Sequence, residues 1–256
     1  MLYSTVKNSQ FSYSIISYIY THKQIHHNKL RFLSKWYLLI PVFMIAGCKN
    51  NSIPAGNADA TIIEYKVTYL TEKAGKIPTK MLPGKMTVIF AGHYALNRIE
   101  GFFGQFSLIY IGNLRNESVI TMLKLFDKKF VYYGKKGELP CGFRDPGKLR
   151  IEETGSSREF LGFNCKELLI TSSGDSTFIA LSTNEIKVKH PNVTTPYKEI
   201  EEVLMEFNTQ LSLLEMQLTA LSVTSQEISW DIFRVSEAYQ EKSREFMENT
   251  IHELFK

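Results

Sequence analysis

The sequence predicts a mainly β (α+β) fold: a curved antiparallel sheet or half-barrel with one amphipathic helix at its C-terminus. Beyond residue 60, apolar side chains recur at every second position, which is typical of half-buried strands. Glycine and proline interrupt the chain about every ten residues, so the strands are short and the turns between them are tight. Near residue 243 the apolar period becomes that of a helix. These observations predict about nine to eleven strands in an antiparallel meander.

The first predicted strand shows the alternation clearly. Its apolar face is formed by Ile63, Tyr65, Val67 and Tyr69, and polar residues lie between them. Further strands are predicted at residues 85–91, 93–99, 105–111, 119–126, 129–133, 148–152, 160–171, 177–181 and 213–224. The segments 122–126 and 130–133 are apolar on both faces, so we expect a helix or a ligand to cover the second face of the sheet there.

The terminal helix begins at a candidate N-cap, Ser243. Apolar residues follow at helical spacing, with glutamates on the opposite side. The spacing predicts an amphipathic helix of about thirteen residues that covers the open apolar face of the sheet.

The basic charge of the chain belongs to its first segment. The whole sequence has 30 basic and 26 acidic residues, but residues 1–47 contain five basic residues and no acidic one. The remaining 25 basic and 26 acidic residues leave residues 48–256 close to neutral, at −1, with the two signs interleaved. No concentrated basic patch for a phosphate backbone is present in the sequence, so we expect no nucleic-acid partner.

The first segment has the order of an export signal. Cationic residues between His26 and Lys35 precede an apolar run, Trp36 to Ile45, and then the small pair Ala46-Gly47. Ten apolar residues are too few to cross a bilayer core of about 30 Å as a helix. The other interpretation of the run is a buried helix of a cytosolic protein. A stretch rich in Asn, Ser, Pro and Gly follows at 50–57 and is typical of a flexible tether.

The residues Ile45, Ala46, Gly47 and Cys48 match all four positions of the lipobox of bacterial lipoproteins. The resemblance implies cleavage before Cys48, a lipid on its sulfur and acylation of the new amino terminus, so that the chain is held at a membrane. Residues 1–47 are then a leader whose true start we place near Leu30, 48–59 a lipidated tether, and 60–256 the folded domain. Lys49-Asn50 lacks the aspartate of inner-membrane retention, which favours the outer membrane, facing the periplasm.

With Cys48 assigned to the lipid, two cysteines remain. Cys141 and Cys165 are an even pair in an oxidising compartment, which makes them a candidate disulfide. Two reduced, partly buried thiols are the alternative.

A second resemblance covers the mature chain loosely. The segment 161–166, a glycine-containing turn and the segment 182–186 resemble the exported GLPGLI-type families, which are similar to the LolA and LolB lipoprotein carriers. The resemblance implies a strongly curved, incomplete barrel with helices in its concave face. The Gly-Leu-Pro-Gly-Leu-Ile signature itself is absent, and residues 199–204 occupy its place.

The segment 197–207 has two interpretations. Its apolar residues follow helical spacing, whereas the resemblance implies a strand beginning near Val203 that pairs with residues 213–224. We expect a short turn or helix as far as Glu202, followed by a strand.

No catalytic motif occurs in the sequence. His93, His190 and His252 are scattered, and no close Cys or His pairs are present, so we expect no catalytic residues, no cofactor and no metal. An aromatic cluster is more suggestive, because it could line a concave apolar cavity for an acyl chain. Its candidate residues are Phe102, Phe103, Phe106, Tyr110, Phe130 and Tyr132. A solidly packed core is the alternative.

The sequence therefore predicts a lipid-anchored, non-enzymatic protein of the cell envelope that binds a lipid or another hydrophobic ligand in its concave face. The alternative is a structural or interaction component of an envelope complex, with a solid core. The sequence identifies no protein partner.

Overall fold

The structure is a computed structural model that describes residues 53–256, apart from 71–72, 75–76, 79–80 and 175. The chain divides into two compact units, residues 1–52 and 53–256, and the described residues belong to the second. The predicted leader, the lipobox residues Ile45, Ala46 and Gly47, and the predicted lipidation site Cys48 lie outside the described residues.

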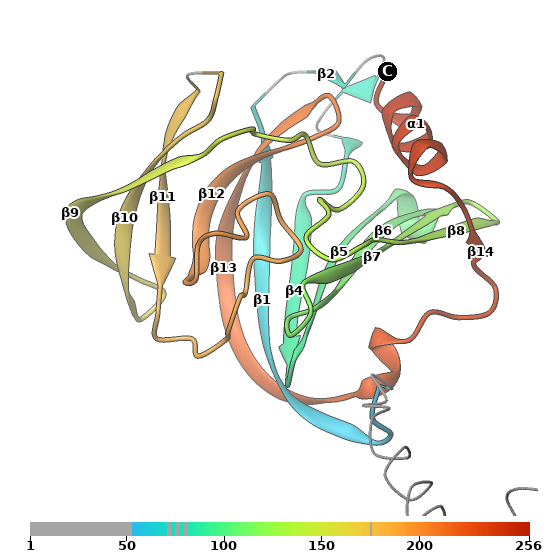
Figure 1. Ribbon diagram of the computed structural model, residues 1–256, viewed down its shortest axis with the longest axis horizontal. Helices are drawn as coiled ribbons and strands as arrows, with labels where there is room; N and C mark the ends of the chain where they lie inside the picture. The colour runs from blue at the N-terminus through green and yellow to red at the C-terminus, as the bar shows by residue number, and fades with distance from the viewer. Residues whose placement is uncertain (1–52, 71–72, 75–76, 79–80, 175) are drawn as a thin grey trace, which may run out of the picture. The chain divides into compact units, whose positions relative to one another are not determined.

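One large open sheet dominates the described unit (Figure 1). Its strands along the chain are β1 (Asn57–Tyr69), β4 (Lys85–Ala91), β5 (Tyr94–Gly101), β6 (Phe106–Asn113), β7 (Ser118–Leu125), β8 (Lys128–Tyr133), β9 (Arg150–Phe160), β10 (Phe163–Thr171), β11 (Thr177–Thr183), β12 (Val203–Leu211), β13 (Leu214–Ser229) and β14 (Gln240–Glu241). Their spatial order is β14-β8-β7-β6-β5-β4-β1-β13-β12-β11-β10-β9. The short strands β2 (Lys73–Ala74) and β3 (Ile77–Pro78) form a separate pair.

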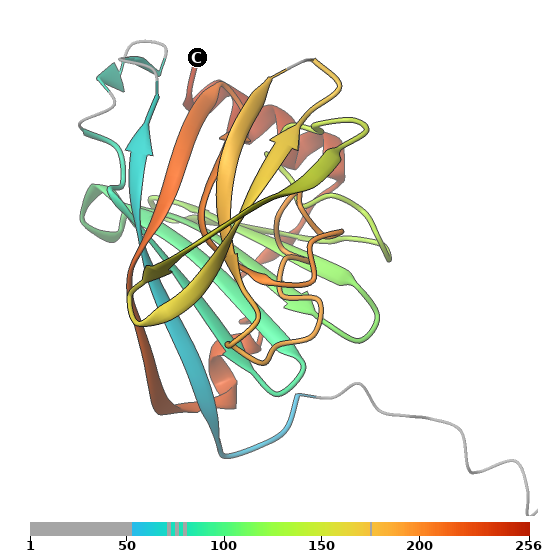
Figure 2. The ribbon, with the colours of Figure 1, turned by 90° about the vertical axis from the view of Figure 1, so that its left-hand side faces the viewer.

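The predicted curved antiparallel sheet with a C-terminal helix is confirmed. The sheet has 12 strands, more than the nine to eleven expected, because the two-residue strand β14 adds itself to the edge, parallel to β8. The first strand begins at Asn57, three residues earlier than predicted, because its pairing with β13 continues to Ser229. The sheet curves strongly, as the view turned by 90° shows (Figure 2).

One predicted strand boundary is wrong. The segment 160–171 is not a single strand, because the chain turns at Leu161 and Gly162 and separates β9 from β10. Both turn residues have positive φ, 53° and 81°, the conformation of a tight hairpin turn. The turn was not predicted because the neighbours of Gly162 are apolar, and an apolar run with one glycine is also typical of a strand interior.

The ambiguous segment 197–207 is resolved as a turn followed by a strand. Turns occupy 191–199, and β12 begins at Val203 and pairs with β13 in register from Glu206 opposite Thr219. The apolar residues at helical spacing are buried although they do not form a helix. Ile200 lies in the connection before β12 and Phe207 in β12, and both side chains pack into the same core. The expected strand is therefore confirmed.

The terminal helix α1 (Arg244–Leu254) begins where predicted. The Ser243 hydroxyl accepts a hydrogen bond from the Phe246 backbone N–H at 3.2 Å, which satisfies one of the free donors of the first turn. Met247 and Ile251 are fully buried against the sheet. No helix in the described part of the chain is long and apolar enough to cross a membrane.

The concave face of the sheet carries the larger core. Side chains of the strands meet α1 and the connections 134–149 and 184–202, which lie inside the curve (Figure 1). Members of this concave core include Ile63, Tyr65, Met86, Val88, Leu108, Tyr110, Leu123, Phe207, Met247 and Ile251. The packing is close: a Cβ added at Gly112 of β6 would lie 2.7 Å from the Thr194 methyl group.

The convex face carries a second, smaller core. The 3₁₀ turn η3 (Trp230–Phe233) and the residues after it cover the outer side of the strands between β4 and β8. Members of this convex core include Ile89, Leu96, Ile111, Met122, Val131 and Phe233. The expectation that something covers the second face of the apolar strands is therefore confirmed, and protein covers both faces.

Candidate functional site

The two cysteines of the domain do not form the candidate disulfide. Cys141 and Cys165 are free thiols, and both are fully buried. Cys141 lies in the connection after β8, near Glu138, Arg244 and Glu248, whereas Cys165 lies in β10 near other charged groups. The predicted pairing is therefore wrong: β8, which precedes Cys141, and β10, which carries Cys165, lie near opposite ends of the strand order, although only 24 residues separate the two cysteines in the sequence.

Four of the six predicted cavity residues are packed or hydrogen-bonded: Phe106, which packs on Phe255, and three others. The Tyr110 hydroxyl donates to the Cys141 carbonyl at 2.8 Å, and its ring lies against Phe143 with centroids 5.2 Å apart. The Phe130 ring meets Phe246 of α1 at 4.9 Å. Tyr132 donates to the Glu138 carboxylate at 2.8 Å. These three side chains therefore help to build the concave core.

A charged network holds α1 against the connection after β8. Arg244 donates to the Leu139 carbonyl at 2.7 Å and forms ion pairs with Glu138 and Glu248 at 3.3 and 2.9 Å. Glu248 in turn accepts from the Gly142 backbone N–H at 2.9 Å. Burial opposes the charge on Glu138, but the Lys135 backbone N–H, the Tyr132 hydroxyl and Arg244 outweigh it and lower the pKa of this carboxyl group. The network fixes the position of the helix.

An apolar pocket of about 310 Å³ opens beside the C-terminal end of α1. It is lined by Leu82, Gln105, Phe106, Leu125, Phe126, Leu254 and Phe255. Phe106 and Phe255 are buried and meet edge to face at 6.4 Å, which forms the wall of the pocket. Phe126 is 70% exposed and lies at the mouth. The volume is at the lower end of the range for sites that hold small molecules.

Phe106 is the predicted cavity residue that lines this pocket. Phe103, in the 3₁₀ turn η2 (Phe102–Gly104), is instead fully exposed to solvent. The side chain of Phe102 lies outside the described part of the chain. The other lining residues were missed, because they come from four separate parts of the chain: Leu82 before β4, Gln105 before β6, Leu125 and Phe126 at the end of β7, and Leu254 and Phe255 at the end of α1. A signal existed at Phe126, since a large aromatic residue beside Asp127 occupies a position where turns favour small or polar residues.

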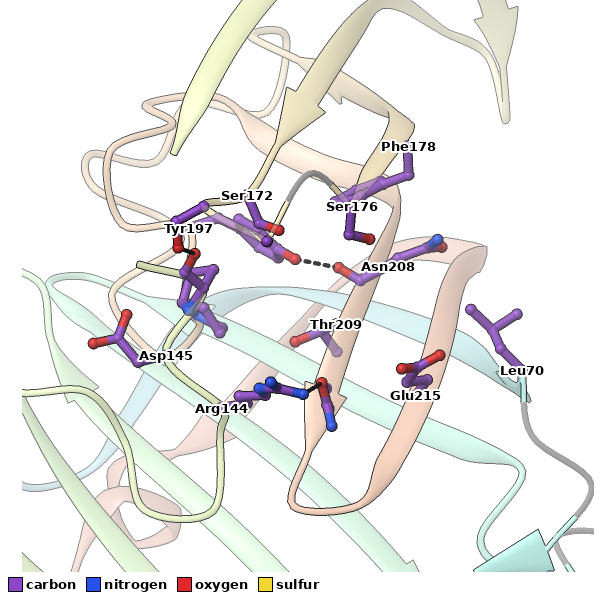
Figure 3. A pocket seen from close by; sticks show the side chains of 15 residues that line it. Leu70, Arg144, Asp145, Ser172, Ser176, Phe178, Tyr197, Asn208, Thr209 and Glu215 are labelled. Carbon is purple, nitrogen blue, oxygen red and sulfur yellow. Dashed lines mark hydrogen bonds between the residues drawn. The ribbon is translucent and has the colours of Figure 1, made fainter. Parts of the chain in front are cut away.

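A second pocket, of about 430 Å³, has a mixed polar and apolar lining (Figure 3). It lies between the connection after β8, the β10–β11 turn and the strands β12 and β13. Its polar and aromatic lining includes Arg144, Asp145, Ser172, Ser173, Ser176, Phe178, Tyr197, Asn208, Gln210 and Glu215.

The polar groups of this second pocket largely bond to one another. Arg144 donates to the Gln210 side chain at 3.1 Å, and Tyr197 donates to the Asn208 carbonyl. Ser173 donates to the Pro146 carbonyl at 2.9 Å. Burial raises the pKa of the Tyr197 hydroxyl well above its usual range, so it stays neutral. No histidine or cysteine is among the described lining residues, whereas the carboxylates of Asp145 and Glu215 are.

The histidines remain apart in the structure. His93 lies in the β4–β5 turn, His190 in the connection before β12, and His252 on α1. The His252 ring contacts the Ser212 hydroxyl at 3.3 Å on an exposed surface, and neither residue lines either pocket. Among the described residues, no group of three or more His, Cys, Asp or Glu side chains could hold a metal ion.

Comparisons with known proteins give one informative likeness. No protein-family model matches the chain, and no curated protein matches it significantly. Among solved structures, the chain is similar to PNGF-II, with 16% sequence identity and a TM-score of 0.51 over 76% of this chain. The match covers 33% of the PNGF-II chain, so this chain spans about a third of that protein. At this identity the likeness concerns the fold alone.

Proposed function

We propose that this chain is a lipid-anchored, non-enzymatic protein of the cell envelope that binds a hydrophobic molecule in its apolar pocket. The observation that carries the proposal is the pocket itself. Its side walls come from Leu82, Phe106 and Phe255, and among the described lining residues Gln105 alone is polar. A preformed site of this kind favours an apolar ligand, because filling it removes apolar surface from water at little cost in polar desolvation.

The fold supports a relationship to the LolA-like carriers. Those families have an incomplete barrel with helices in the concave face, and here α1 packs on the concave side of an open, curved sheet. The volume sets a limit, however. Because α1 and the two inner connections fill most of the concavity, the ligand we propose is one acyl chain or part of one, held at the edge of the concave face.

Filling the pocket should remove ligand binding. Leu254 is partly buried in the lining, and a Leu254→Trp ring would occupy the space that an acyl chain needs. We expect affinity for a fluorescent fatty acid to fall by about tenfold or more, as the loss of one well-buried apolar contact implies. The measurement is fluorescence titration of the purified Cys48→Ser chain.

Phe246→Trp is the matched control, since Phe246 lies on the same helix, is 38% exposed and faces Phe130 outside this pocket. Its affinity should equal that of the parent. If neither the parent nor the control binds fatty acid, and native mass spectrometry finds no lipid bound to the protein purified from cells, the ligand-binding proposal fails.

The membrane anchor is tested separately. The Cys48→Ser change should release the protein from the membrane fraction and abolish its labelling by radioactive palmitate, because the sulfur that would carry lipid is gone. Cys141→Ser is the control and should remain in the membrane fraction with full labelling. Continued labelling of the Cys48→Ser protein would exclude Cys48 as the modified residue.

A second function is favoured by the packing of the concave core. Tyr110, Leu123 and Met247 are almost completely buried there, as in a sheet that only supports contacts with other proteins. On this alternative the chain is a structural or interaction component of an envelope complex. Absence of fatty-acid binding, together with retention of the protein in a large envelope assembly, would favour it.

A further inference from the structure

Three large apolar side chains project into solvent at or next to residues that line the apolar pocket. Met81 is 60% exposed, Phe103 fully exposed and Phe126 70% exposed. Phe126 lines the pocket. Met81 and Phe103 do not, but Met81 directly precedes the lining residue Leu82, and Phe103 lies two residues before the lining residue Gln105. These three residues, the apolar rim, come from three different connections: the one before β4, the β5–β6 turn and the β7–β8 turn. Stability of the fold does not require them there, since none of the three is buried.

The backbone at two of these positions is unfavourable for an aromatic residue. Phe103 and Phe126 have φ values of 53° and 55°, in the left-handed region. Glycine or asparagine occupies such turn positions at lower cost, and a bulky side chain there is uncommon. Leu161 in the β9–β10 turn shares this positive φ, so the backbone alone does not indicate a contact; Phe103 and Phe126 differ from it because they lie at or next to residues that line the pocket.

Lysines flank both phenylalanines. The Lys124 ammonium group donates to the Gly104 carbonyl at 2.7 Å, directly beside Phe103. Lys128 is exposed and follows Phe126 after the exposed Asp127, so one carboxylate lies between Lys124 and Lys128 in the sequence of this turn. An exposed aromatic ring next to a lysine is the pairing expected at an anionic lipid surface, where the ring enters the headgroup region and the ammonium group stays at the level of the phosphates.

We propose that the apolar rim docks on an anionic lipid surface. A protein partner would need a matched pocket for each of three separate protruding side chains, whereas a lipid interface accepts separate protrusions without shape complementarity. The docked orientation places the pocket mouth against the lipids, so an acyl chain could pass between the membrane and the pocket without crossing water. That route rests on the proposed function, but the docking itself does not require the pocket to be filled.

Phe103 allows the docking to be tested apart from the pocket, because it does not line the pocket. In the full chain carrying Cys48→Ser, Phe103→Ser should reduce binding to vesicles of phosphatidylglycerol and phosphatidylethanolamine in equal parts by about tenfold. Phe103→Trp should retain binding. Vesicles of phosphatidylcholine alone should bind the parent more weakly, because the lysines lose their partners.

Leu161→Ser is the matched control. Leu161 is 43% exposed and also has a positive φ, 53°, but it lies in the β9–β10 turn, away from the pocket. Its binding should equal that of the parent, and circular dichroism should show both serine variants folded. Residues 1–47 are common to all variants, so only differences between variants are compared.

Quenching gives the decisive local measurement. The indole of Phe103→Trp should be quenched by vesicles with brominated acyl chains, whereas that of Leu161→Trp should not, above the shared background of Trp36 and Trp230. Absence of quenching at position 103, or equal vesicle binding by Phe103→Ser and the parent, would overturn the proposal.

A dimer contact is the other outcome that would overturn it. In that case the parent would sediment as a dimer, the Phe103→Ser protein would sediment as a monomer, and position 103 would not be quenched, so the rim would be a contact between two copies. Loss of fatty-acid binding by Leu254→Trp tests only the pocket.

Discussion

Individual residues acquire their chemistry here from burial more than from their type. Cys141 and Cys165 would be reactive thiols on a surface, yet both are fully buried. Burial raises the pKa of the Cys141 thiol to about 11 and also raises that of Cys165, so neither forms the reactive thiolate at neutral pH. The phenylalanines at positions 103 and 126 show the reverse, since residues that usually pack inside are here held in solvent by the turn that carries them.

This burial makes a direct prediction about the thiols. In the folded Cys48→Ser chain, neither Cys141 nor Cys165 should react with a maleimide at pH 7, whereas both should react in denaturant. Mass spectrometry counts the added labels: none in the folded chain and two in the unfolded one. As a control, Glu201→Cys introduces a thiol at an exposed position and should add one label to the folded chain. No label after denaturation without reductant, which would mean that the two cysteines are joined, or rapid labelling of the native chain, would contradict the free and buried state.

At the scale of elements, the terminal helix shows how a local signal and a distant contact combine. The N-cap at Ser243 and the apolar spacing after it are local, so the helix was predictable from the sequence. What the helix covers is not local. Ile251 packs so closely on the connection after β8 that a Cβ added at Gly142 would lie 3.0 Å from its side chain.

Truncation of this contact should weaken the domain. Ile251→Ala removes a fully buried side chain and leaves a cavity between α1 and the connection, so we expect a loss of about 2–5 kcal/mol in the free energy of unfolding. Urea unfolding followed by circular dichroism measures it. Glu253→Ala, two residues further along the helix, removes an exposed ion pair with Lys256 and should change the stability by no more than about 0.5 kcal/mol. Equal effects of the two changes would show that α1 does not contribute to the core.

The strands show which parts of an element the sequence predicts. The alternation of apolar and polar residues identified most of the strands, because the side chains of a strand's buried face are apolar and lie at every second position. The turn at Leu161-Gly162 was missed, since its residues are typical of a strand as well as of a turn. The two-residue strand β14 was also missed, because it exists only through pairing with β8.

At the scale of the whole molecule, the two edges of the sheet differ in how much of their surface other parts of the chain cover. The strands between β4 and β8 have a core on each face, whereas β9 at the opposite edge exposes nearly all its side chains. The apolar pocket opens on the doubly covered side, beside the end of α1. β1 begins at the other end of the sheet, where Asn57 pairs with Ser229, while Lys66 near its far end pairs with Lys85 close to the pocket. β1 therefore begins at the end of the strands away from the pocket.

The sequence by itself determined the features that are encoded locally: the alternation of the strands, the capped terminal helix, the net positive charge of residues 1–47, which contain no acidic residue, and the resemblance of residues 45–48 to a lipobox. Only the tertiary structure decided which aromatic residues are core, which line a pocket and which project into solvent. It also separated Cys141 from Cys165 and gathered Leu82, Phe106, Phe126 and Phe255 around one cavity. The physical reason is that a side chain's neighbours across a curved sheet are set by strand register and by the connections that fold into the concavity, and these pairings depend on residues far apart in the chain.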